Sequence, residues 1–151
     1  MTEDWGAILV VDDDAEMREL AHDVLKDRGH QVMTAGSGQE ALKLLAEQDY
    51  AVVVTDLRMK GMPGTELLME IKRLYPDIGV ILMTAFGTVD TAVEAMKRGA
   101  SDYLTKPVKN DELVRVVERS IREASLRREV NRLRREVHKE YSFHQIIGKS
   151  K

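Results

Sequence analysis

Residues 8–14 read ILVVDDD, an unbroken apolar run that ends directly in three acidic residues. Two more short apolar runs occur along the chain, AVVVT at 51–55 and GVILM at 79–83. Continuously apolar segments of this length are typical of strands whose two faces are both covered by helices, as in parallel sheets. The stretch over 7–11 therefore predicts a buried strand, and its acidic end places charge at the edge of a sheet.

Helical patterns separate these apolar runs. Apolar residues at helical spacing, with glycine or proline near the expected ends, predict helices over 15–27, 38–47, 64–74 and 88–98. Two weaker strands fit residues 31–34 and 102–104. Five strands that alternate with helices favour an open α/β sheet with right-handed crossovers.

The composition is that of a packed protein without cysteine. Of the 151 residues, 43% are hydrophobic and 32% are charged, which favours a folded core over disorder. The absence of cysteine excludes a disulfide framework and any thiolate metal site or nucleophile. No segment has the order of a signal peptide, and no apolar run approaches the ~20 residues that span a bilayer, so we expect a cytoplasmic protein without a membrane partner.

Polar side chains follow four of the five predicted strands. They are Asp12, Asp13 and Asp14 after the first strand, Asp56 after the third, Thr84 after the fourth and Lys106 after the fifth. In open α/β sheets the ligand crevice lies beyond the carboxyl ends of the strands. We therefore expect these side chains to converge on one site, although each alone could be a turn residue or a helix cap, as we expect Asp14 to be.

The chemistry that fits such a cluster is metal-assisted phosphoryl transfer. Clustered carboxylates raise one another's pKa unless a cation offsets their charge, and Mg²⁺ suits the site because it prefers oxygen ligands. Asp56 could then act as the nucleophile that forms an aspartyl phosphate. Lys106 would supply a positive charge to the phosphoryl group, and the Thr84 hydroxyl a hydrogen bond.

The motifs at the strand ends resemble those of response-regulator receiver domains. ILVVDDD at 8–14, VVVTDLRM at 52–59, MTA at 83–85 and TKP at 105–107 match that family in order and spacing. The similarity covers roughly residues 7–122. It implies a flavodoxin-like fold, in which a five-stranded parallel sheet of order 2-1-3-4-5 has helices on both faces.

The resemblance also implies a metal site and an acceptor. Asp12 and Asp13 correspond to the acidic pair of the family, with Asp13 a direct Mg²⁺ ligand, and Asp56 corresponds to the phospho-acceptor. The backbone carbonyl of Arg58 corresponds to the third metal contact. One position departs from the family, which commonly has proline where this chain has Lys60, so the loop could differ in stiffness or electrostatics.

A switching function follows from the same resemblance. Lys106 corresponds to the phosphoryl-binding lysine that usually precedes a cis proline, here Pro107, and Thr84 and Tyr103 match the pair whose rearrangement reports phosphorylation. The implied protein is a regulatory domain rather than an enzyme. A sensor histidine kinase donates a phosphoryl group to Asp56, and homodimer contacts through the fourth helix, fifth strand and fifth helix then shift.

An extended C-terminal helix is predicted from residue 111 to about 137, a stretch without glycine or proline. Acid–base pairs at i,i+4, among them Glu118–Arg122 and Glu123–Arg127, favour an exposed helix. A stripe with coiled-coil spacing follows, formed by Leu126, Val130, Leu133 and Val137. We expect the first half of the helix to pack on the sheet and the second half to pair with a partner helix; the alternative is a single amphipathic helix lying on the same domain.

The C-terminal segment is mildly basic. Residues 109–140 carry ten Lys and Arg against seven Asp and Glu, whereas the rest of the chain is acidic. The arginine-rich stretch 127–135 could be a DNA-binding arm. Because acidic residues are interleaved with the arginines, we favour a solvated helix face that makes no direct contact with nucleic acid.

A narrower resemblance suggests a larger protein. Residues 86–108 are similar to receivers of the enhancer-binding (NtrC-like) transcription activators, and FHQIIGKS at 143–150 resembles the opening of their AAA+ ATPase domain. We therefore expect a receiver over 1–122, a coiled-coil linker over 123–140 and the poorly ordered start of a truncated output domain over 141–151.

Another class of protein shares part of this pattern. Mg²⁺-dependent phosphatases of the haloacid-dehalogenase type use an Asp-x-Asp motif after the first strand, a spacing that Asp12 and Asp14 also have. Their motif continues to threonine or valine where this chain has Glu16, which disfavours this alternative.

Overall fold

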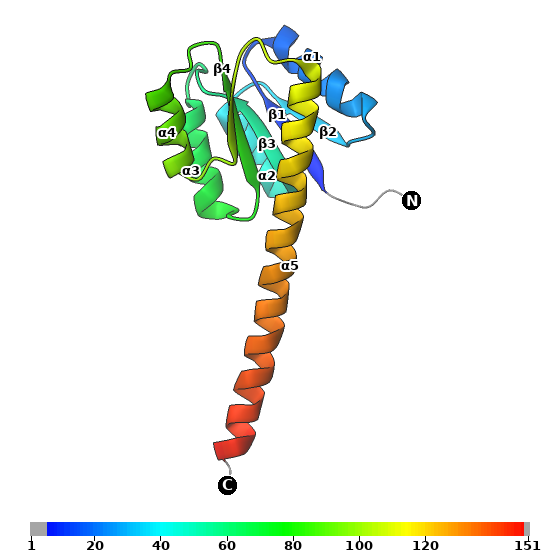
Figure 1. Cartoon of the computed structure of the whole chain (residues 1–151), viewed down its shortest axis with the longest axis vertical. Coiled ribbons are helices and arrows are strands. Elements are labelled where there is room, and N and C mark those ends of the chain that lie inside the picture. The colour runs from blue at the N-terminus through cyan, green and yellow to red at the C-terminus, as the bar shows by residue number, and fades with distance from the viewer. Residues whose placement is uncertain (1–5, 150–151) are drawn as a thin grey trace.

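The computed structural model describes residues 6–149, with side chains described over 6–139. Its centre is a five-stranded parallel sheet in the order β2-β1-β3-β4-β5 (Figure 1). The strands are β1 (Ala7–Val11), β2 (Val32–Ala35), β3 (Tyr50–Asp56), β4 (Gly79–Thr84) and β5 (Asp102–Thr105). The predicted sheet and its strand order are confirmed. The main shift is in β2, which begins and ends one residue later than predicted.

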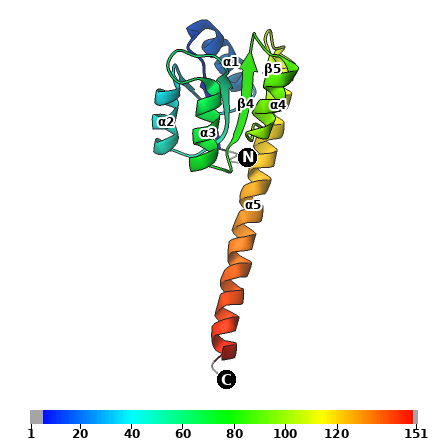
Figure 2. The same ribbon diagram turned by 90° about the vertical axis from the view of Figure 1, so that its left-hand side faces the viewer.

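Helices cover both faces of the sheet (Figures 1 and 2). They are α1 (Ala15–Asp27), α2 (Gly38–Glu47), α3 (Gly64–Leu74), α4 (Val89–Lys97) and α5 (Asn110–Lys149). The apolar faces of α2, α3 and α4 close one core cluster, and those of α1 and α5 close the other. The three central strands are almost completely buried because they contribute side chains to both clusters.

Side-chain caps fix where the helices begin. Asp14 accepts hydrogen bonds from the backbone N–H groups of Glu16 and Met17, so its predicted role as a helix cap is confirmed. Thr88 and Thr91 form a reciprocal capping box at the start of α4. These caps fix the ends of the loops that follow β1 and β4. Because the strands are parallel, the polar ends of these strands lie at one edge of the sheet.

The first half of α5 packs on the sheet as expected. Its inward stripe, which includes Leu113, Val117, Ser120 and Ala124, is at most 5% exposed. The second half projects beyond the globular body as a continuation of the same helix (Figures 1 and 2). The helix therefore does not lie wholly on its own domain.

Contacts between α5 and the body continue past the predicted domain boundary at residue 122. Arg128 Nη2 donates to the Tyr50 carbonyl at 2.5 Å, and Asn131 Nδ2 donates to Asp77 Oδ1 at 2.8 Å. We name Arg127, Arg128 and Asn131, with their acceptors on Tyr50 and Asp77, the basal clasp. The body thus holds the helix as far as Asn131, which lies within the segment assigned to the linker.

Two predicted ion pairs on α5 do not form. Glu118 instead contacts His30 Nε2 at 2.8 Å and Arg28 Nη2 at 3.3 Å, because this part of the helix faces α1. Arg127 donates to the Asp77 carbonyl at 3.1 Å rather than pairing with Glu123. The i,i+4 spacing predicted these pairs, but in the folded chain Glu118 and Arg127 each bind groups outside α5 instead.

Two other predictions concern the ends of the chain. Trp5 precedes Asp12 in an extended stretch, so the sequence predicts that it lies at the opposite end of the sheet from the acidic cluster. Trp5 lies outside the described residues, as do residues 150–151. The segment predicted to be a poorly ordered start of an output domain is helical as far as Lys149, since α5 continues to that residue. Its assignment to an output domain stays a prediction. Within the described residues, no helix is long and apolar enough to cross a membrane.

Candidate functional site

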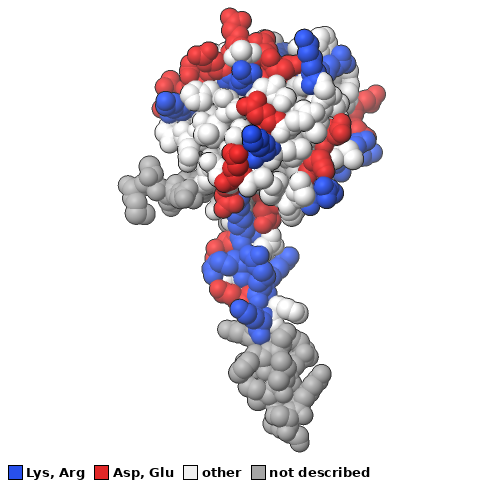
Figure 3. Space-filling view, turned by 180° about the vertical axis from the view of Figure 1, so that it is seen from behind, with Lys and Arg blue, Asp and Glu red and all other residues white. Residues whose placement is uncertain are grey.

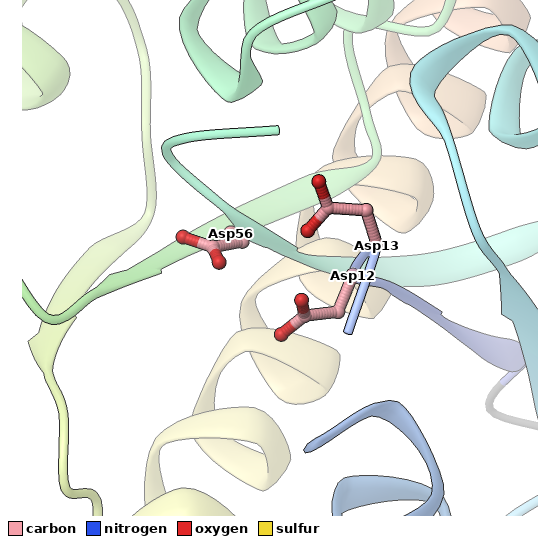
Figure 4. A group of neighbouring side chains, drawn as sticks. All are labelled: Asp12, Asp13 and Asp56. Carbon is pink, nitrogen blue, oxygen red and sulfur yellow. The ribbon is translucent and has the colours of Figure 1, made fainter. Parts of the chain in front are cut away.

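Three carboxylates meet at the carboxyl ends of β1 and β3 (Figure 4). One oxygen from each of Asp12, Asp13 and Asp56 lies within 4.8 Å of the others. Asp12 is buried at 1% exposure, Asp56 is half-buried, and Asp13 is exposed. The cluster is thus open to solvent on the side of Asp13.

Lys106 brings a positive charge into this cluster from the loop after β5. Its Nζ donates to Asp12 Oδ2 and Asp56 Oδ2, each at 3.1 Å. Burial alone would lower the pKa of the Lys106 ammonium, but its hydrogen bonds to Asp56 and Asp12 outweigh that effect and raise the pKa. The peptide bond from Lys106 to Pro107 is cis, as the resemblance implied.

Asp12 is held from several sides. Its Oδ1 accepts the Asp14 backbone N–H at 3.0 Å, and its backbone carbonyl accepts Arg18 Nη1 at 2.7 Å. Burial raises the pKa of the Asp12 carboxyl, against the opposing effects of the Asp14 hydrogen bond and of Lys106. A further cation that binds at the cluster would therefore stabilise the charged form of the Asp12 carboxylate.

The loop after β3 orients the other two carboxylates through its backbone. The N–H of Arg58 donates to Asp56 Oδ1 at 3.2 Å, and the N–H of Lys60 donates to Asp13 Oδ2 at 3.0 Å. Proline at position 60 would have no N–H to donate, so the departure from the family pattern supplies a contact to the acidic cluster. At the start of α3, a side chain on Gly64 would collide with the backbone carbonyl of Asp56, so glycine permits this close approach.

Within the described residues, neither Thr84 nor Tyr103 makes a hydrogen bond to the carboxylates of the cluster. The buried Thr84 hydroxyl accepts the Phe86 backbone N–H at 3.1 Å, while the Lys106 N–H donates to the Thr84 carbonyl at 2.8 Å. The Tyr103 hydroxyl lies 2.8 Å from Thr91 Oγ1 on α4. The two predicted switch residues are therefore each bonded within the segment formed by β4, α4 and β5.

Comparison with known proteins agrees with this geometry. Residues 8–118 match the response regulator receiver domain family. The chain belongs to that family. This match assigns it to the receiver domains of two-component response regulators rather than to the haloacid-dehalogenase-type phosphatases.

Individual relatives of this receiver domain include a response regulator and a transcriptional regulatory protein. It is 44% identical over 112 residues to the response regulator protein FleR of Pseudomonas aeruginosa, covering 74% of this chain and 24% of FleR. It is 45% identical over 121 residues to the transcriptional regulatory protein ZraR of Escherichia coli, covering 80% of this chain and 27% of ZraR. The chain thus spans about a quarter of the length of these relatives.

Solved structures show the same fold. NtrX of Brucella abortus is 38% identical with a TM-score of 0.79, over 85% of this chain and 29% of NtrX. A receiver domain protein of Clostridium thermocellum is 36% identical with a TM-score of 0.76, over 80% of this chain and 98% of that one.

The donor set of this receiver domain fits a hard divalent cation. Three carboxylates offer oxygen ligands within a small space, and the amine nearest to them, Lys106, is already bonded to two of the three. The side chain of Arg58 points elsewhere, since its guanidinium lies 4.6 Å from the centre of the Phe86 ring. Its carbonyl as a metal contact stays a prediction.

Sequence reasoning missed several supporting residues. Arg18 lies outside the acidic motif, on α1, but donates a hydrogen bond to the Asp12 carbonyl. Thr91 is the hydrogen-bond partner of Tyr103. The spacing from Thr88 to Thr91 was a visible capping signal, whereas nothing in the sequence links Arg18 to the Asp12 carbonyl.

Proposed function

We propose that Asp56 accepts a phosphoryl group from the phosphohistidine of a sensor kinase. The observation that carries this proposal is the ammonium of Lys106, which bridges Asp56 and Asp12 at 3.1 Å inside a cluster of three carboxylates. An Asp56 oxygen forms the new bond to phosphorus while the bond from phosphorus to the imidazole nitrogen breaks. The electron pair of the broken bond stays on the imidazole nitrogen, and the ring, which carries a proton on its other nitrogen before the transfer, leaves as the neutral base.

Mg²⁺ is the cofactor that this site would hold. Asp12, Asp13 and Asp56 would bind it with the backbone carbonyl of Arg58, and it would supply charge neutralisation to the phosphoryl oxygens. The protein groups that hold this arrangement are the Arg58 and Lys60 backbone N–H groups, which orient Asp56 and Asp13. Pre-oriented carboxylates lose less freedom when the cation binds.

Lys106 and Thr84 would stabilise the transferred group. Lys106 is positioned to exchange one of its carboxylate contacts for a phosphoryl oxygen, since its Nζ already lies beside the acceptor. The Thr84 hydroxyl, which now accepts the Phe86 N–H, would turn to donate to the phosphoryl group. Release of that N–H and of the Tyr103–Thr91 contact would then alter the surface of α4, β5 and α5.

The consequence of this switch would be exerted on a following domain. The response regulator FleR and the transcriptional regulator ZraR, which resemble this chain, are each about three times as long, which supports an output domain beyond α5. We propose that phosphorylation changes a homodimer, formed through α4, β5, α5 and the projecting helix, that controls a transcription-activating output domain. We expect such a switch to act in the cytoplasm together with its kinase.

The test is phosphoryl transfer to purified protein. With Mg²⁺ and a small phosphoryl donor such as acetyl phosphate, the wild type should be labelled on one residue, and Asp56→Asn should lose labelling by at least about a hundredfold. Asp23→Asn, an exposed carboxylate on α1, is the matched control and should label normally. Undiminished labelling of Asp56→Asn would disprove the assignment.

A further inference from the structure

The loop between β3 and α3, residues 57–63, meets the acidic cluster through its backbone. The Lys60 N–H donates to Asp13 Oδ2 at 3.0 Å, at the position where the family commonly has proline and therefore no N–H. The exposed Lys60 side chain takes no part in this bond. The departure from the family pattern thus ties the exposed carboxylate of Asp13, which follows β1, to a loop that follows β3.

A second contact of the same loop fixes its position against α2. The Met62 side chain lies directly on Gly38, the buried first residue of α2. A methyl group added to Gly38 would come within 2.7 Å of Met62 Sδ and 2.9 Å of Met62 Cβ, closer than such atoms approach without a shift. Met62 also packs against the core cluster closed by α2, α3 and α4. We name this contact the Gly38–Met62 seat.

The rest of the loop is held as well. The Leu57 carbonyl accepts the Gly64 N–H at 2.9 Å, and Met59 is only 9% exposed. Because one residue separates Lys60 from Met62, the two Cα atoms are at most about 7 Å apart. A shift of Met62 therefore moves the N–H that reaches the acidic cluster.

This N–H orients the carboxylate that has the most freedom. Asp13 is the exposed member of the cluster, whereas Asp12 is buried and held by the Asp14 N–H and by Lys106. An exposed carboxylate loses rotamer freedom when it binds a cation, and a bond formed beforehand reduces that loss. A carboxylate oxygen has two lone pairs, so Asp13 can accept the N–H and still bind a cation.

The charge of this end of the molecule does not by itself define a site. Asp and Glu side chains gather at the upper end of the body, where β5 leads into α5, and Lys and Arg gather on the projecting helix (Figure 3). Such a field attracts cations to the upper end without fixing where they bind. The affinity of one site there depends on how firmly its ligands are held.

We propose that the Gly38–Met62 seat sets the affinity of the acidic cluster for Mg²⁺ by holding the Lys60 N–H against Asp13. Gly38, Met62 and Lys60 are then positioning residues, because none of them contributes a carboxylate to the cluster and they act through Asp13. The inference rests on the Mg²⁺ site of the proposed function and adds to it a determinant on α2, outside the cluster.

Replacement of the seat residues tests the link from α2 to the metal site. Mg²⁺ is titrated into the isotope-labelled 151-residue chain, and binding is followed by the NMR shifts of the backbone amides. Gly38→Ala, which displaces Met62, and Met62→Ala, which removes the anchor, should each weaken Mg²⁺ binding about three- to tenfold, the effect of one lost orienting bond. Lys43→Ala, an exposed residue of α2 away from the seat, is the control and should bind Mg²⁺ as the wild type does. Wild-type affinity in both seat variants would overturn the proposal.

The two seat substitutions should also depend on each other. In Met62→Ala the side chain that would collide with a residue at position 38 is gone, so adding Gly38→Ala should weaken Mg²⁺ binding by less than about a further twofold. Fully additive effects would show that residues 38 and 62 act independently, and would contradict the seat.

A pair of variants at position 60 separates the N–H from the side chain. Lys60→Ala loses the ammonium and keeps the N–H, whereas Lys60→Pro loses both. Lys60→Pro should therefore bind Mg²⁺ about three- to tenfold more weakly than Lys60→Ala, and equal affinities would overturn the role of the N–H. Since proline also restricts the residue before it, the seat variants provide the test that leaves residue 60 unchanged.

Hydrogen exchange of the Lys60 amide reports on the seat without any metal. In the Mg²⁺-free wild type this amide should be protected, and in Gly38→Ala and Met62→Ala it should exchange about two- to tenfold faster, although neither substitution alters Lys60. Exchange at the wild-type rate in both variants would show that the seat does not hold the loop.

Acetyl phosphate labelling separates this inference from the proposed function. The seat variants should need about three- to tenfold more Mg²⁺ for half-maximal labelling of Asp56, and should approach the wild-type level at saturating Mg²⁺. A lowered level at saturating Mg²⁺ with unchanged Mg²⁺ affinity would overturn the positioning role. Absence of labelling in every protein, the wild type included, would refute the proposed function, while the Mg²⁺ titration and the amide exchange would still decide the inference.

Discussion

At the scale of single residues, the acidic cluster is an electrostatic cost to the folded domain. Asp12 is almost completely buried, and its carboxyl has a raised pKa because burial disfavours the charged form. Lys106 offsets part of the charge of Asp12 and Asp56, but one ammonium faces three carboxylates. The site is therefore built for a further cation rather than for stability.

Replacement of Asp12 by asparagine should remove part of this electrostatic repulsion and so raise the stability of the domain without Mg²⁺. Asp12→Asn keeps an acceptor for the Asp14 N–H and removes one charge, so without Mg²⁺ the variant should be about 1 kcal/mol more stable to unfolding than the wild type. Mg²⁺ should stabilise the wild type and have a smaller effect on the variant. Thermal unfolding with and without Mg²⁺ measures both effects, and Asp23→Asn, away from the cluster, is the control. A variant that is less stable than the wild type in Mg²⁺-free buffer would contradict this view of the site.

At the scale of elements, the periodicity of the sequence predicted the strands and helices, whereas the long-range contacts between them could not be predicted. The apolar runs of β1, β3 and β4 are recognisable as buried strands in the sequence. Because parallel strands share one carboxyl edge, the sequence also predicted that Asp12, Asp56 and Lys106 lie close together. The basal clasp could not be predicted from the sequence, because it joins Asn131 to Asp77 across 54 residues and no sequence pattern relates the two. These contacts lie beyond residue 122, and the domain boundary assigned there stays a prediction.

The basal clasp should control how firmly α5 is held where it leaves the body. Asn131→Ala removes the hydrogen bond to Asp77, and Arg128→Ala removes that to the Tyr50 carbonyl. A hydrogen bond contributes about 0.5–1.5 kcal/mol, so amide exchange over residues 122–135 should become about two- to tenfold faster in either variant.

Hydrogen exchange measured by mass spectrometry resolves this segment. Arg135→Ala, on the same helix but outside the clasp, is the control and should leave exchange unchanged. If both clasp variants exchanged like this control, the hydrogen bonds would not hold the helix.

At the scale of the whole molecule, the acidic cluster and the exit of α5 lie at opposite ends of the sheet. The cluster follows the carboxyl ends of the strands, whereas the basal clasp binds Tyr50 and Asp77, at the amino ends of β3 and β4. Since α5 packs along the sheet between these ends, it is the element that can connect a charge change at Asp56 with the projecting helix. The same basal end contains a half-buried cation, Lys72, next to the clasp residues Arg127 and Asp77.

Lys72 should make the stability of the domain depend on pH. Burial, and secondarily repulsion by Arg127, lowers the pKa of Lys72 to about 8, against the attraction of Asp77. Between pH 8 and the ordinary lysine value of 10.5, the unfolded chain holds a proton that the folded chain has lost, so the contribution of Lys72 to the free energy of unfolding increases with pH across this window. Below pH 8 both states hold the proton, and the contribution becomes constant.

Urea unfolding of the wild type and of Lys72→Met at several pH values from about 7 to 10.5 measures this contribution, because other titrating groups are common to both proteins. The wild type should gain stability relative to Lys72→Met as the pH rises through 8. Lys43→Met, on α2 away from the clasp, provides the control, and its difference from the wild type should stay constant. A constant difference for Lys72→Met too would mean that the ammonium of Lys72 is solvated in the folded domain, and that the bonds from its Nζ to the Ile78 and Pro76 carbonyls leave it accessible to water.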